Sequence, residues 1–137
     1  MNVAGPAVVT GSNFTRELPR TRECARLARE FLEDSIPHSP SLNSSRLIAS
    51  ELVSNAFQYG NGAIKISLEL GKQLEVKLSV SSGFDLTAKE PNLTREGGTE
   101  GLVESGRGLL IVDSLSSRWG WDISGSTLIV WADVSVD

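Results

Sequence analysis

Two groups of residues in this sequence have types and a spacing that catalysis could use. The first lies in SELVSNAFQYG, residues 50–60, where an apolar helical pattern also carries Glu51, Asn55 and Gln58 at positions i, i+4 and i+7 of one helix face. A glutamate can accept a proton from an attacking hydroxyl or water. An asparagine carbonyl one turn away is a hard oxygen ligand suited to Mg²⁺.

The second group is Gly106-Arg107-Gly108, which opens the predicted helix GRGLLIVDSL after a long glycine-bearing loop. A helix N-terminus attracts anions, and glycines let a phosphate approach the backbone closely. Together the two groups predict a phosphoryl-transfer site. Each alone is more often an ordinary helix surface or turn, and neither of the common glycine-rich nucleotide loops occurs. On spacing alone, the sequence therefore indicates an α/β domain with a candidate nucleotide site.

Size and composition narrow the class of protein. A chain of 137 residues fits one domain, and its 13 basic and 17 acidic residues argue against a general nucleic-acid binder. The lone Cys24 excludes an internal disulfide and a cysteine zinc site, and His38 is also alone. Because no apolar stretch of about 18 residues occurs, we expect a soluble cytoplasmic protein without a membrane partner. Five arginines interleave with glutamates between residues 16 and 30, which indicates a solvated helix face.

The elements that must position these residues follow from periodicity. We expect a short strand at residues 7–10 and a helix with Pro19 in its first turn, running to Ser35. A second helix should begin near Ser39-Pro40 and end near Phe57. The segments AIKISLEL and QLEVKLSV predict two strands joined by a hairpin turn at Gly71-Lys72. The segment GRGLLIVDSL predicts a helix from residue 106, and SSRWGWDI and STLIVWADV predict two closing strands. Residues 83–105 have no periodicity and predict a functional lid or disorder.

The segments SELVSNAFQYG, ESGRGLLIVDSLSSRWGW and LIVWADV resemble the single-domain anti-sigma-factor kinases of actinobacteria. These belong to the ATPase superfamily of gyrase, histidine kinases, the Hsp-type chaperone and MutL, which share the Bergerat fold. The resemblance runs from about residue 14 to the end. It implies an α+β two-layer sandwich: a mixed, mostly antiparallel sheet covered on one face by about three helices. It also implies a single histidine-kinase-like ATPase domain over residues 1–137, with an ATP lid at 83–105.

The resemblance also implies roles for individual residues. Glu51 would be the catalytic base, and Asn55 would hold Mg²⁺ beside bound ATP. Proteins of this kind bind a sigma factor and phosphorylate a serine on an anti-anti-sigma partner of the STAS type. They resemble switch proteins that form homodimers through the face around the first strand and helix. The other residues implied in nucleotide binding are Ser81, Ser82, Gly83, Asp85, Gly106, Arg107, Gly108, Leu109 and Thr127.

Three departures from the family pattern affect the nucleotide side. Ser81-Ser82-Gly83 stands where an adenine-reading aspartate is usual, and Asp85 comes three or four residues later. Gln58-Tyr59 replaces a basic residue and a histidine. The last strand lacks a preceding lysine, and Thr127 is offset by two residues from the expected adenine-side threonine.

These departures leave three functional hypotheses. The first is an ATP- and Mg²⁺-dependent protein-serine kinase of the anti-sigma-factor type, which also sequesters a sigma factor. The second is a degenerate, nucleotide-independent module that sequesters a regulatory protein without kinase activity. The third is a structural or heterodimerising subunit, which leaves the Glu51/Asn55 stripe without a purpose. Three explanations fit an intact Glu51/Asn55 pair beside an altered adenine side: weak nucleotide binding, a shifted turn that brings in Asp85, or a structural hydrogen bond made by Glu51.

Overall fold

The computed structural model describes residues 11–84 and 106–135, and these residues form one sheet and one layer of helices. The helices and strands follow the predicted order strand, two helices, two strands, helix, two strands. In chain order they are β1 (Gly11–Leu18), α1 (Cys24–Ser35), α2 (Pro40–Tyr59), β2 (Asn61–Gly71), β3 (Val76–Gly83), α3 (Gly106–Leu115), β4 (Arg118–Ser124) and β5 (Thr127–Val134).

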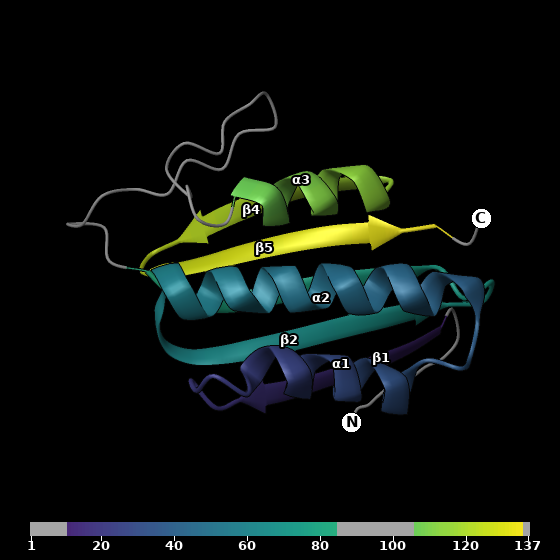
Figure 1. Cartoon of the computed structure of the whole chain (residues 1–137), viewed down its shortest axis with the longest axis horizontal. Helices are drawn as coiled ribbons and strands as arrows, with labels where there is room; N and C mark the ends of the chain where they lie inside the picture. Colours follow the sequence, from purple (N-terminus) through teal and green to yellow (C-terminus); the bar gives the residue numbers. More distant parts are fainter. Residues whose placement is uncertain (1–10, 85–105, 136–137) are drawn as a thin grey trace.

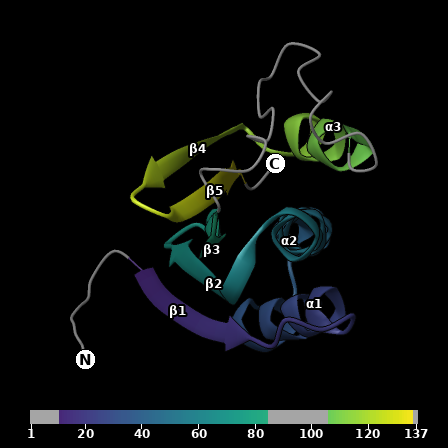
Figure 2. The same cartoon turned by 90° about the vertical axis from the view of Figure 1, so that its left-hand side faces the viewer.

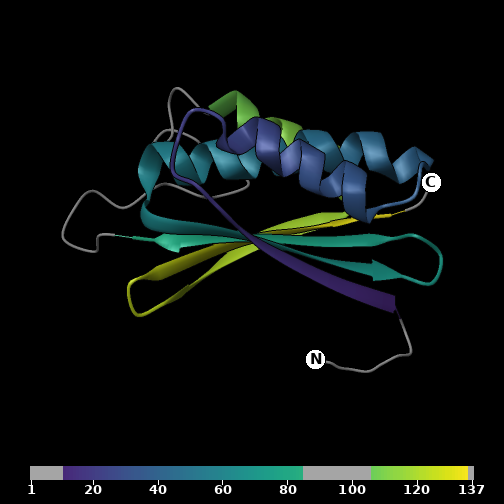
Figure 3. The ribbon, with the colours of Figure 1, turned by 90° about the horizontal axis from the view of Figure 1, so that it is seen from below.

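The five described strands form a sheet in the order β1-β2-β3-β5-β4, and every pairing in it is antiparallel. The three helices lie side by side on one face of this sheet, with α2 between α1 and α3 (Figures 1 and 2). Seen from below, the opposite face of the sheet has no described helix over it (Figure 3). This is the predicted two-layer α+β sandwich.

The core lies between the helix layer and the sheet, because alternate strand residues point to that side. On β5, for example, Val130, Ala132 and Val134 are buried, whereas the residues between them are half-buried on the other face. Cys24 belongs to the same core at 2% exposure, and burial raises the pKa of its thiol above the ordinary value. Within the described residues, no helix is long and apolar enough to cross a bilayer.

The first strand differs from the sequence prediction. Residues 7–10 lie outside the described part of the chain, and β1 instead covers Gly11–Leu18, which the sequence analysis did not identify. The sequence does not predict this strand because Arg16 interrupts the alternation of apolar residues. Arg16 lies between Phe14 and Leu18 on the side that faces the helix layer. Its guanidinium carbon lies 4.9 Å from the centroid of the Phe31 ring, so Arg16 makes a cation–π contact with α1.

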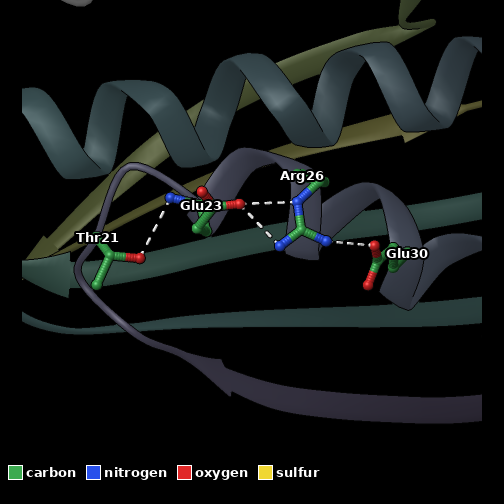
Figure 4. Close-up of polar contacts among 4 residues, drawn as sticks. All are labelled: Thr21, Glu23, Arg26 and Glu30. Carbon is green, nitrogen blue, oxygen red and sulfur yellow. Dashed lines mark hydrogen bonds and ion pairs between the residues drawn. The ribbon is translucent and has the colours of Figure 1, made fainter.

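Helix α1 begins later than predicted, and the interpretation of Pro19 as a first-turn residue was wrong. The backbone N–H of Thr21 donates to the Pro19 carbonyl, and that of Cys24 donates to the Thr21 carbonyl, so residues 19–23 form turns. Thr21 Oγ1 then accepts a hydrogen bond of 3.2 Å from the Glu23 backbone N–H (Figure 4). The short connection lets the side chain of Arg20 reach α2.

The arginine-rich face of α1 matches its prediction only in part. Arg26 donates to Glu23 and to Glu30 one turn on either side, and both carboxylates raise the pKa of its guanidinium (Figure 4). These are exposed pairs on a solvated helix face. Arg29 instead donates to Ser50 Oγ on α2 at 2.9 Å, and Arg20 is half-buried.

The second helix and the hairpin follow their predictions closely. Pro40 occupies the start of α2 as expected, although the Ser39 side chain does not cap the helix. The hairpin turn between β2 and β3 is longer than Gly71-Lys72, because the Gly71 backbone N–H donates to the Glu75 carbonyl. Leu74 in this turn adopts a φ of 67°. The two closing strands and α3 form where the sequence predicted them.

Candidate functional site

The polar stripe of α2 lies beside a pocket between the helix layer and the sheet. Helix α2 contributes Leu52, Asn55, Ala56 and Tyr59 to the pocket wall, at the i, i+3, i+4 and i+7 positions of one face. The remaining wall comes from Gly60 after α2, from Leu109 of α3, and from strands β3 (Val80 and Ser82) and β5 (Leu128 and Val130). Residues distant in sequence therefore meet here, as predicted for Asn55, Ser82 and Leu109.

The pocket is narrow in this conformation. It encloses about 30 Å³, which is room for about one water molecule. A larger hollow, of about 350 Å³, lies on the opposite face of the sheet around Thr15, Ser67 and Ser79. The narrow pocket is the candidate site, because the larger hollow contains none of the predicted site residues.

Glu51 lies next to this pocket, although it is absent from its lining. It is half-buried, like Asn55 one turn later, and both side chains belong to the same stripe of α2. The Glu51 carboxylate makes no hydrogen bond or ion pair with any described residue. Nothing in residues 11–84 and 106–135 therefore supports a structural hydrogen bond as the reason for this glutamate. A carboxylate left without a partner beside a pocket is available to a ligand.

The end of β3 separates the two serines that the sequence analysis treated together. Ser82 shares the helix-facing side with Val80 and is 5% exposed, whereas Ser81 lies on the opposite face of the sheet. Gly83 ends the strand opposite Thr127 of β5. Of the predicted adenine-side residues at this strand end, only Ser82 contributes to the pocket, and Asp85 lies outside the described residues.

Gly60 explains why the chain breaks directly after the SELVSNAFQY helix. A Cβ atom at this position would collide with Ser82 Oγ and would lie 2.8 Å from the Gly83 carbonyl oxygen. The end of α2 therefore packs against the end of β3 without any intervening side chain. This close approach holds Asn55 and Ser82 on opposite walls of one pocket.

The third helix begins at Gly106, as predicted, and brings Leu109 into the pocket wall. Its first turn thus starts near the pocket, where unpaired backbone N–H groups favour a phosphate. Thr127 does not join the pocket: it is exposed and faces the other side of the sheet, while Leu128 next to it lines the wall. Gly106, Arg107 and Gly108 remain predictions as phosphate-binding residues.

Several pocket residues were not identified from the sequence. Val80, Leu128 and Val130 are strand residues that any core would use, so their types carry no functional signal. Tyr59 was noted only as a departure from the family pattern. Tyr59 follows Asn55 by four residues, so helical spacing places both on one face of α2 and could have identified Tyr59 as a pocket residue.

Arg20 is a further residue at this site that sequence reasoning assigned to a solvated face. Its Nε donates to the Gly62 carbonyl at 2.7 Å, and its Nη1 donates to the carbonyls of Ala56 and Phe57 at 3.1 and 2.8 Å. These are carbonyls at the end of α2, where a cation is also favoured by the helix dipole. Arg20 thus ties the loop before α1 to the turn of α2 that forms the pocket.

The donor set fits Mg²⁺ bound together with a nucleotide. Among the described residues, no three histidine, cysteine, aspartate or glutamate side chains cluster to hold a metal by themselves. Mg²⁺ needs few protein ligands when phosphates and waters fill its shell, and Asn55 offers one neutral oxygen at the pocket. The apolar wall residues suit a flat base, and Ser82 and Asn55 are polar residues of the pocket wall.

Comparisons with known proteins identify the family and support the fold. A family model described as the histidine kinase-like ATPase domain matches residues 14–132. The fold is similar to a crystal structure of the RsbU and RsbW domains of Rv1364c from Mycobacterium tuberculosis, with a TM-score of 0.64, 18% sequence identity and 91% of this chain covered. This chain spans 32% of that structure's length. The search of curated proteins found no match to this chain. Since the family match covers nearly all of the sheet and helices, the chain belongs to the histidine kinase-like ATPase domain family.

Proposed function

We propose that this protein is an ATP-dependent regulatory switch of the anti-sigma-factor type. In this proposal it binds ATP with Mg²⁺ in the α2 pocket, sequesters a sigma factor in the cytoplasm, and phosphorylates a serine of a STAS-type anti-anti-sigma protein. The observation that carries it is the meeting of Asn55, Ser82 and the first turn of α3 around one pocket, beside Glu51. Membership in the ATPase family supports nucleotide binding. The RsbW domain in the similar structure suggests the kinase and its partners.

The residues of this chain would divide the chemistry as follows. Asn55 would hold Mg²⁺, and the backbone at the start of α3 would orient the phosphates of ATP, which would supply the phosphoryl group. Glu51 would accept the proton of the partner's serine hydroxyl as that oxygen bonds to the terminal phosphorus and ADP leaves.

Calorimetric titration with ADP, in the presence and absence of Mg²⁺, tests the nucleotide part of this proposal. We expect micromolar binding that needs Mg²⁺ and that weakens by about tenfold or more in Asn55→Ala, because one metal ligand is lost. The matched control is Asn43→Ala, an exposed asparagine of the same helix outside the pocket. Absence of binding up to millimolar nucleotide would contradict the proposal.

A second candidate function has its own supporting observation. The pocket encloses only about 30 Å³, and the polar group on its sheet wall is a hydroxyl in place of a carboxylate. Both features favour a nucleotide-independent module that sequesters a regulatory protein. The two candidates differ in the calorimetric result and share the sequestration of a regulatory protein. The homodimer stays a prediction in both, with β1 at one edge of the sheet.

A further inference from the structure

The sheet wall of the pocket carries a single polar side chain. Val80 and Ser82 come from β3, and Leu128 and Val130 come from β5 beside them. Three of these four side chains are aliphatic, so Ser82 Oγ is the only group on this wall that can make a directional contact with a ligand. Leu52 and Leu109 close the pocket from the helix side.

Ser82 and Asn55 occupy different depths of the site. Ser82 is 5% exposed and packs against Gly60, whereas Asn55 is half-buried on α2. The hydroxyl of Ser82 makes no hydrogen bond to another described residue. Because this oxygen borders the pocket and has no partner among the described residues, it is available to a ligand that can donate or accept a hydrogen bond. The sheet wall of the pocket is thus apolar apart from the Ser82 hydroxyl.

A nucleotide matches this division in one orientation. Its charged phosphates belong at the half-buried Asn55 and the first turn of α3, where Mg²⁺ and backbone N–H groups can hold them. Its flat and weakly polar base belongs against the aliphatic wall. In that orientation the polar edge of the base meets Ser82.

We propose that Ser82 reads the base edge without discriminating between adenine and guanine, so the site accepts both purine nucleotides. This inference rests on the proposed nucleotide binding and goes beyond it. A carboxylate can only accept a hydrogen bond, so it pairs with the 6-amino group of adenine and repels the 6-oxo group of guanine. A hydroxyl can accept from the 6-amino group of adenine or donate to the 6-oxo group of guanine, so it leaves the group at position 6 paired in either complex. Discrimination requires such an unpaired group in one of the two complexes.

The first test compares ADP and GDP binding to the unmodified protein by calorimetry, with Mg²⁺ present. We expect the two dissociation constants to agree within about fivefold, since neither base leaves Ser82 unsatisfied. A preference for ADP of about thirtyfold or more would overturn the inference, because another group would then read the base. Binding of neither nucleotide would instead overturn the proposed function, and the inference with it.

Substitutions at Ser82 test whether this residue sets the ratio of ADP to GDP affinity. Ser82→Asp should create a preference for ADP over GDP of about tenfold or more, because the new acceptor faces the guanine oxygen. Ser81→Asp is the matched control: it adds the same charge to the neighbouring residue on the opposite face of β3, and should leave the ratio unchanged.

The buried aspartate could prevent folding, so Ser82→Ala provides a second test. Removing the hydroxyl should weaken ADP and GDP binding by the same factor, about threefold to tenfold, and preserve their ratio. A loss of affinity confined to one of the two nucleotides would contradict the inference. Far-ultraviolet circular dichroism of each variant establishes that a change in binding does not come from unfolding.

Discussion

At the scale of single residues, α2 carries a carboxylate whose presence the fold does not require. Glu51 is half-buried and has no hydrogen-bond or ion-pair partner among the described residues. Partial burial of a charge without a partner is unfavourable, so this glutamate contributes little to the free energy of unfolding. Its position one turn before Asn55 suits a group that meets the hydroxyl of an incoming protein substrate.

Replacing Glu51 by glutamine therefore separates catalysis from folding. We expect Glu51→Gln to lower the rate of phosphoryl transfer from Mg·ATP to a STAS-type protein by about 100-fold or more, because the amide cannot take the proton. The ADP dissociation constant and the free energy of unfolding should stay near wild type. Labelled-phosphate transfer measures the first quantity, and calorimetry and urea unfolding measure the other two.

Glu69→Gln is the control for this substitution, since Glu69 is an exposed carboxylate of β2, a strand that contributes nothing to the pocket wall. It should transfer phosphate at the wild-type rate. A Glu51→Gln variant that phosphorylates its partner as fast as wild type would show that this glutamate is not the base.

At the scale of elements, Arg20 connects segments that the pocket depends on. Its guanidinium donates to two carbonyls at the end of α2 and to the Gly62 carbonyl at the start of β2. Helix ends leave carbonyls unpaired, and a cation there also complements the helix dipole. The same turn of α2 supplies Ala56 and Tyr59 to the pocket. The loop before α1 thus helps to fix the pocket wall.

Arg20→Ala should destabilise the protein by about 2–3 kcal/mol, because hydrogen bonds from a charged group to partly buried carbonyls are lost. Nucleotide binding should weaken as well, since the pocket wall loses its tether. Arg20→Lys should lie between wild type and Arg20→Ala, because a single ammonium cannot reproduce the guanidinium geometry. Urea unfolding gives the free energies, and calorimetry gives the affinities.

Arg22→Ala is the comparison for this series. Arg22 is exposed two residues later in the same loop and makes no hydrogen bond or ion pair with other described residues, so its removal should change stability by less than about 0.5 kcal/mol. Equal destabilisation by the two alanine variants would mean that general charge in this loop, and not the Arg20 contacts, supports α2.

At the scale of the whole molecule, one core joins the helix layer to the sheet, and Cys24 reports on it. The thiol is 2% exposed, and burial raises its pKa above the ordinary 9.0. The folded state thus holds the thiol proton more tightly than the unfolded state. This contribution to stability is fully present below the unfolded pKa and declines as pH rises above it.

We therefore expect the free energy of unfolding to decrease above about pH 9 through this group, and Cys24→Ala to reduce that decrease. A thiol reagent should react with native protein slowly and with urea-unfolded protein at the rate of a free cysteine. Absorbance of the released reagent measures both rates. Rapid labelling of the native protein at neutral pH would contradict the burial of this residue.

The sequence by itself determined the element order and the stripe that joins Glu51 to Asn55. These are local features, because side-chain periods of two and 3.6 residues fix which residues share a face. The family resemblance predicted the fold class, which the antiparallel sheet and three helices confirm. Asp85 and the other residues of 85–105 lie outside the described part of the chain, as does the side chain of Arg107.

Only the tertiary structure decided which residues meet. The register of β3 puts Ser82 in the pocket and Ser81 on the other face, a one-residue difference that composition does not reveal. Thr127 faces away from the pocket for the same reason. The long side chains of Arg16 and Arg20 contact Phe31 and the end of α2, segments distant in sequence. Such contacts depend on how elements pack, and no local pattern encodes them.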